Sequence, residues 1–88
     1  MTEPGRYAVR IKASAERELD GLPRPVLDRI VSALVRLELQ PRPRGTKKLR
    51  GTSECRIRVG SYRILYTVDD RHRLVEIVAV GHRKDVYR

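Results

Sequence analysis

The chain has 88 residues and a formal net charge of +9 at pH 7, so we expect one domain over residues 1–88 with a single core and little more. No apolar run is long enough for a transmembrane helix, and the only cysteine, Cys55, cannot form an internal disulfide, which is typical of a cytoplasmic protein. His72 and His82 have no second ligand at a suitable spacing, so we expect neither a metal site nor a cofactor.

The first predicted elements are a strand and a short helix. Residues 7–12 alternate between apolar and polar side chains, which is typical of a strand. Its apolar face consists of Tyr7, Val9 and Ile11. Ser14 is expected to cap the helix that follows, because a serine side chain can accept a hydrogen bond from a free backbone N–H of the first turn. Gly21 and Pro23 are expected to end that helix.

A second and longer helix is predicted from about Pro25 to the residue before Pro41, because proline is tolerated in a first helical turn. Its predicted inward stripe consists of Leu27, Ile30, Val31, Leu34 and Leu37. A loop follows this helix. The sequence does not decide whether residues 46–50 form a short strand or only an extended lead-in to the next element.

Residues 55–66 predict a β-hairpin, because side chains alternate on both sides of the dipeptide Gly60-Ser61. A two-residue turn there implies a register. The implied pairs are Val59 with Tyr62, Arg58 with Arg63, Ile57 with Ile64, and Arg56 with Leu65. Like charges directly opposite each other destabilise a sheet. We therefore interpret the three arginines on this face as an anion site rather than as a solvated surface.

Residues 74–80 are almost continuously apolar, which predicts a central strand covered on both faces. The order β-α-α-β-β-β is typical of an α+β domain. We expect a mostly antiparallel, twisted sheet with the two N-terminal helices packed on one face. The arginines of the hairpin should then lie on the opposite face.

Positive charge is concentrated between residues 41 and 63, where eight basic residues stand against one acid, Glu54. Such a field attracts polyanions. Nucleic acid is the first candidate partner and an acidic protein the second. A membrane surface is the weakest candidate, because no basic amphipathic helix carries the charge.

An ordered set of short motifs resembles the RelE/ParE toxin superfamily over nearly the whole chain, and RelE-type mRNA endonucleases in particular. Leu22-Pro23 ends the first helical segment, and Lys48-Leu49-Arg50-Gly51 follows the second. The pattern Arg-x-Arg-Val-Gly-x-Tyr-Arg-x-x-Tyr spans residues 56–66, and Val-Gly-His-Arg…Val-Tyr spans residues 80–87. The resemblance implies the RelE-like microbial RNase fold.

The resemblance also implies an activity and a set of site residues. RelE-like toxins cut mRNA in the ribosomal A site without metal, by attack of the substrate's own 2′-hydroxyl on the adjacent phosphate. The family's catalytic positions fall on Arg56, Arg58, Arg63, Arg83 and Tyr87. Some relatives carry lysine at the first pair, and a lysine can lose its proton and act as a base. Arginine is always charged, so here electrostatic stabilisation is the expected role.

Further basic residues extend this site. His82 is a candidate acid–base group, because its pKa range suits proton transfer. The residues expected to contact RNA or ribosome are Arg44, Lys47, Lys48 and Arg50. The implied partners are the ribosome with its mRNA and a RelB-like antitoxin in a hetero-oligomeric complex. Two alternatives stay open: a ParE-type toxin that inhibits gyrase by binding, and an RNA- or DNA-binding module without catalysis.

Overall fold

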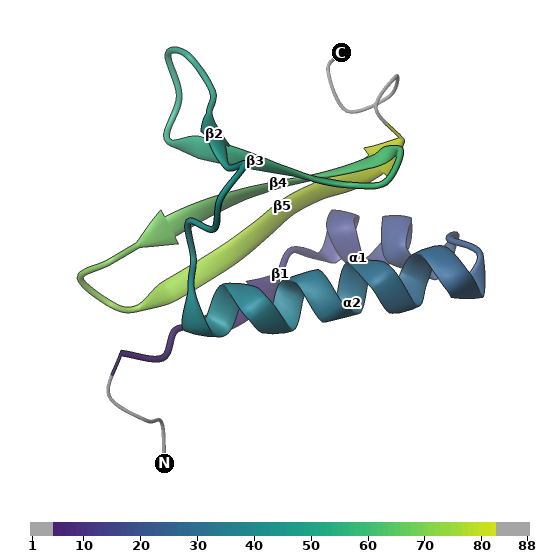
Figure 1. The fold of residues 1–88 in the computed structure, drawn as a ribbon, viewed down its shortest axis with the longest axis horizontal. Helices are drawn as coiled ribbons and strands as arrows, with labels where there is room; N and C mark the ends of the chain where they lie inside the picture. Colours follow the sequence, from purple (N-terminus) through teal and green to yellow (C-terminus); the bar gives the residue numbers. More distant parts are fainter. Residues whose placement is uncertain (1–4, 83–88) are drawn as a thin grey trace.

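The computed structural model describes residues 5–82 as two helices packed on one face of a five-stranded sheet (Figure 1). The elements are β1 (Ala8–Ile11), α1 (Ala13–Asp20), α2 (Arg24–Leu39), β2 (Lys47–Lys48), β3 (Glu54–Val59), β4 (Tyr62–Asp69) and β5 (Leu74–His82). The strand order is β1-β5-β4-β3-β2. β1 runs parallel to β5 and the other neighbours are antiparallel. The predicted α+β class is confirmed, and residues 46–50 contribute a two-residue edge strand.

α1 begins directly after β1, so the predicted cap at Ser14 is wrong. The residue at the N-cap is Lys12, which makes no side-chain cap hydrogen bond. Its backbone N–H donates to the carbonyl of Ile77 at 3.0 Å, and its own carbonyl accepts from the N–H of Glu16 at 2.9 Å. Pairing with β5 thus holds the chain extended up to Lys12 and leaves Ser14 inside the first turn.

α2 begins and ends where the prolines predicted. Its buried residues are Ile30, Leu34 and Leu37. Val31, however, is 46% exposed, so its predicted place in the inward stripe is wrong. One residue turns an α-helix by about 100°, so Val31 lies on the flank of the buried stripe. It shares this flank with the exposed Val35 and Leu39.

The hairpin has the predicted register at every pair, from Val59 opposite Tyr62 to Arg56 opposite Leu65. Gly60 has a φ of +61°, and Ser61 is not among the residues with positive φ. A glycine with positive φ at the first turn position is the pattern of a type II′ turn, which matches the twist of the two strands. The local sequence is therefore sufficient to align this hairpin.

β5 is central as predicted, but the expectation that both its faces are covered is wrong. Its buried residues Val75, Ile77 and Val80 face the helices, and its other side chains are only partly buried. The register with β4 shifts between Leu65 and Tyr66, so β5 carries an extra residue there, as in a β-bulge. The carboxylate of Glu18 on α1 accepts the N–H of Val80 at 2.9 Å next to this bulge.

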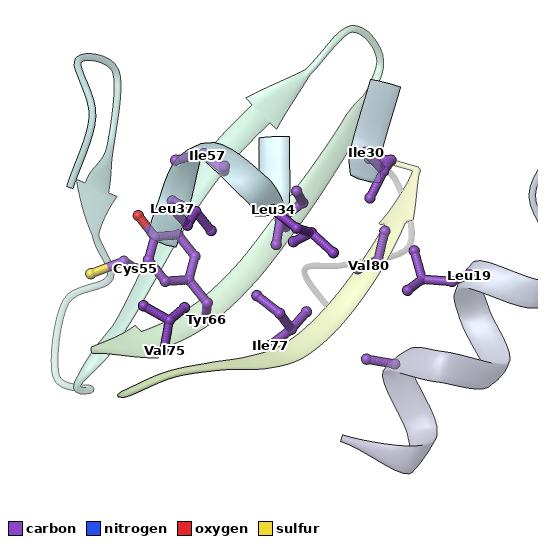
Figure 2. Close-up of a cluster of buried hydrophobic side chains, with 12 residues drawn as sticks. Leu19, Ile30, Leu34, Leu37, Cys55, Ile57, Tyr66, Val75, Ile77 and Val80 are labelled. Carbon is purple, nitrogen blue, oxygen red and sulfur yellow. The ribbon is translucent and has the colours of Figure 1, made fainter. Parts of the chain in front are cut away.

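The core lies between the helices and the sheet, where Figure 2 shows side chains of α1 and α2 meeting those of β3, β4 and β5. Tyr66 is its largest fully buried side chain. The hydroxyl of Tyr66 donates to the carbonyl of Pro41 at 2.7 Å. Cys55 is buried in the same cluster, as a small core residue is expected to be. Neither helix in the described part of the chain is long and apolar enough to cross a membrane.

Candidate functional site

Three arginines share the face of the sheet that points away from the helices. Ile57 and Ile64 are buried in the core, so side-chain alternation places their strand neighbours on the opposite face. Arg58 lies directly opposite Arg63, and Arg56 is next on that face of β3. On its other side Arg63 pairs with Gly81 of β5. Because glycine has no side chain, β5 places none beside Arg63 at this position.

The backbones of Arg58 and Arg63 lie close together. In a hairpin with a two-residue turn the pair next to the turn exchanges both hydrogen bonds, so the following pair is non-hydrogen-bonded, with Cα atoms about 4.5 Å apart. Two guanidinium groups that start from this spacing can converge on one anion. Arginine is suited to this, because its planar fork of N–H donors matches the geometry of a phosphate.

Replacing Arg58 with threonine is expected to raise the free energy of unfolding slightly, by about 0.2–1 kcal/mol, because it removes a like-charge cross-strand pair and adds a β-branched residue. The same change should lower activity. Denaturant unfolding of the purified variant beside the parent chain measures the first effect. A clear loss of stability would show instead that the guanidinium of Arg58 has a structural role.

An open groove of about 730 Å³ lies between α2 and β3. Its basic lining residues are Arg29 and Arg36 of α2, Arg44 of the following loop, Lys47 of β2, and Arg56 and Arg58 of β3. No acidic residue lines it within the described part of the chain. The predicted binding residues Arg44 and Lys47 are thus brought together with Arg56 and Arg58.

Arg29 and Arg36 were not among the residues singled out from the sequence. The sequence does indicate that these two arginines lie together, because a spacing of seven residues puts two side chains on the same flank of a helix. That this flank borders β3 is a property of the packing. Two other predicted residues, Lys48 and Arg50, lie in or beside the β2–β3 connection and outside the groove.

The structure does not bring His82 among the arginines. His82 pairs with Tyr62, and the two rings make an edge-to-face contact with centroids 5.6 Å apart. Tyr62 lies on the same face of β4 as the buried Ile64, so His82 lies on the helix side and Arg63 on the other. The bulge in β5 is the reason, since one extra residue reverses which face the following side chains occupy. The remaining predicted residues, Arg83 and Tyr87, lie outside the described residues.

The loop that closes one end of the groove is held by Asp70 from the β4–β5 turn. Arg42 donates two hydrogen bonds to the carboxylate of Asp70, both at 3.0 Å. The hydroxyl of Tyr7 donates to the same carboxylate. The hydrogen bond from Arg42, and after it that from Tyr7, lowers the pKa of Asp70 below its ordinary value. The neighbours of Arg42 in the chain are Pro41 and Pro43. The carbonyl of Pro41 accepts a hydrogen bond from the hydroxyl of Tyr66, and Pro43 lines the groove.

Replacing Asp70 with asparagine is expected to lower the melting temperature at pH 7, because the ionised carboxylate accepts hydrogen bonds from both Arg42 and Tyr7. The folded-state pKa of Asp70 is depressed, so its stabilisation is present above the unfolded pKa and is lost as the pH falls through the folded value. The difference between the two proteins should therefore shrink below about pH 3.8, the ordinary value for the group. Melting curves recorded from pH 7 downward test this, and a difference independent of pH would contradict it.

Within residues 5–82 no group of three or more His, Cys, Asp or Glu side chains could hold a metal ion. The described site carries several positive charges on a sheet face and along a groove. Such a site can bind a phosphate group and stabilise the negative charge that gathers on it during transfer.

Comparison with known proteins relates the whole fold to one group. A family model described as the ParE toxin of type II toxin–antitoxin systems, parDE, matches residues 9–87. Toxin RelG of Mycobacterium tuberculosis is 40% identical over 86 residues, covering 93% of this chain and 97% of that protein.

Solved structures of similar chains point to the same group of toxins. The toxin–antitoxin complex RelBE2 of M. tuberculosis contains a chain with a TM-score of 0.80 and 37% identity, over 89% of this chain and 99% of that one. An archaeal RelE–RelB complex from Pyrococcus horikoshii OT3 gives a TM-score of 0.81 at 29% identity, over 92% of this chain and 99% of the other.

Proposed function

The chain belongs to the RelE/ParE toxin superfamily and is a toxin of a type II toxin–antitoxin system, and we propose that it acts as an mRNA endonuclease in the ribosomal A site. The observation that carries this proposal is the placement of Arg58 directly across from Arg63 on the face of the sheet away from the helices. Two facing arginines at this position can stabilise the negative charge on a phosphate during transfer.

In the proposed reaction the 2′-hydroxyl of one nucleotide loses its proton and attacks the adjacent phosphorus. The bond to the 5′-oxygen of the next nucleotide breaks, that oxygen takes up a proton, and a 2′,3′-cyclic phosphate remains. Arg63 and Arg58 stabilise the negative charge on the pentavalent phosphate, with Arg56 beside them. None of these arginines can serve as the base, because a guanidinium does not lose its proton in proteins. By family resemblance Arg83 and Tyr87 complete the set, and no metal is needed.

The proposed partners follow from the relatives. Similar toxin chains were solved in RelB–RelE complexes. By analogy a RelB-like antitoxin would bind this chain in a hetero-oligomeric complex and cover its catalytic groups. The strongly basic surface suits an antitoxin with acidic segments. The free toxin would act in the cytoplasm on translating ribosomes.

The decisive experiment is controlled induction of the chain in cells that lack its antitoxin, followed by mapping of mRNA 5′ ends. Cuts within translated reading frames, in phase with codons and absent from untranslated messages, are expected. The inducible Arg63→Ala variant is the control for expression. Intact mRNA during growth arrest would refute the proposal.

A gyrase-directed activity is the second candidate, because the matching family model is described as a ParE toxin. It predicts an SOS response with intact mRNA. The third candidate, a nucleic-acid-binding module without catalysis, predicts binding that weakens steeply with salt and no new mRNA ends. The same induction experiment therefore separates all three candidates.

A further inference from the structure

We infer that the groove between α2 and β3 binds an RNA phosphodiester backbone, and that Arg29 and Arg36 of α2 supply phosphate contacts in addition to those of the hairpin. This inference rests on the proposed function, because it names how the same toxin would hold RNA beside the reacting phosphate. The residues on β3, Arg56 and Arg58, belong to both the groove and the arginine face. RNA bound in the groove would therefore continue directly to that face.

The charged residues that line the groove are of one sign. Six basic residues and no acidic one from the described part of the chain line it. The hydrogen bonds and ion pairs within residues 5–82 give neither Arg29 nor Arg36 a carboxylate partner. By contrast, Arg24 of the same helix pairs with Asp28 at 3.2 Å. The two groove arginines are thus available to an anion, and a concave surface with one sign of charge concentrates the field inside it.

The two sides of the groove come close enough to act together. A guanidinium nitrogen of Arg29 lies 3.5 Å from where a Cβ on Gly60 would be. The arginine of α2 therefore reaches the turn of the hairpin that carries Arg58 and Arg63. Arg36 lies two helical turns further along α2, toward the loop that contributes Arg44. Positive charges thus follow the length of the groove, as a run of successive phosphates requires.

The shape and lining favour RNA backbone over an acidic protein segment. A protein strand could add to the outer edge of β3 only beyond Arg56, where the pairing with β2 ends. Between Arg56 and the turn, alternation leaves only the backbone groups of Arg58 pointing outward, which is too few for a strand. The centre of a protein interface is also depleted of charge, unlike this groove. No tyrosine or histidine of residues 5–82 lines it, so these residues offer bases no aromatic ring to stack on. Binding through phosphate contacts should be independent of sequence.

The test measures binding apart from cleavage. The ligand is a mixed-sequence 2′-O-methyl RNA, which lacks the attacking hydroxyl and so cannot be cut by the proposed chemistry. The double variant Arg29→Gln/Arg36→Gln should reduce the slope of log affinity against log salt by about 1.4, since each lost contact to a single strand contributes about 0.7. The variant Arg29→Lys/Arg36→Lys keeps both charges and should retain most of the slope.

The matched control is Arg17→Gln/Arg71→Gln, which removes the same charge from exposed positions outside the groove. Its salt slope should stay close to that of the parent chain. An equal loss in the control would overturn the inference, because the effect would then be one of net charge. The inference would also be overturned by an unchanged salt slope in the groove variant or by a loss of slope in the lysine variant. Poly-glutamate serves as a model of an acidic protein segment. If the groove variant lost affinity for poly-glutamate but not for RNA, that result would overturn the inference as well.

The outcome is independent of the proposed catalytic activity. If the parent chain never cleaves mRNA but the groove variant loses the predicted slope, the endonuclease proposal fails and the groove assignment stands. If the chain cleaves mRNA but the salt slopes of the parent chain and the groove variant are equal, the groove assignment fails and the endonuclease proposal stands.

Discussion

Replacing Arg63 with alanine is expected to abolish growth arrest while leaving the chain folded. Arg63 lies opposite Arg58 on the face of the sheet away from the buried cluster. Removing one donor that stabilises a transition-state charge typically lowers the rate about 10²- to 10³-fold. Growth after induction gives the first readout. The rate of single-turnover cleavage of an mRNA codon in programmed ribosomes gives the second.

Arg10 offers a matched control for this prediction. It lies on the same face of the sheet, but its side chain pairs with Glu76 of β5 at 3.3 Å. Arg10→Ala removes the same charge and the same side chain outside the arginine cluster, so cleavage should stay close to that of the parent chain. If the Arg63→Ala protein is folded and still arrests growth at equal expression, the assignment of the site is wrong.

Replacing Tyr66 with alanine should have the largest effect on stability. Its ring is fully buried in the core, and deleting a buried aromatic ring costs about 3–5 kcal/mol. Small domains have a total stability of only about 5–15 kcal/mol, so the variant should be close to unfolding at 25 °C. Denaturant unfolding followed by circular dichroism measures the change.

Tyr66→Phe separates the ring from its hydroxyl. Burial raises the pKa of Tyr66, so the hydroxyl stays protonated and donates to the carbonyl of Pro41. Losing this hydrogen bond should cost about 0.5–1.5 kcal/mol, well below the cost of the alanine variant. The exposed Val35 is the control, because Val35→Ala should change the free energy of unfolding by less than about 0.5 kcal/mol. Equal losses for Phe and Ala would mean that the hydroxyl, and not the ring, carries the stabilisation.

Several parts of the fold are determined by short stretches of sequence. The hairpin register follows from Gly60-Ser61 and from the alternation on both sides, and all four predicted pairs are present. The bounds of α2 follow from Pro25 near its start and Pro41 just after its end. In each case the deciding interactions lie within a few residues of one another, so neighbouring residues contain the whole signal.

Other features of the site depend on contacts between distant residues. The bulge in β5 places His82 on the helix side and Gly81 beside Arg63, and a simple alternation of strand residues cannot reveal an inserted one. Val31 is exposed and Arg29 and Arg36 border β3 because of how α2 is rotated against the sheet. The periodicity of a helix or strand shows which side chains share a face. Only the packing of the elements decides which other element that face contacts. The sequence by itself therefore determined the arginine pair of the hairpin, and the tertiary structure decided that two arginines of a helix lie alongside it.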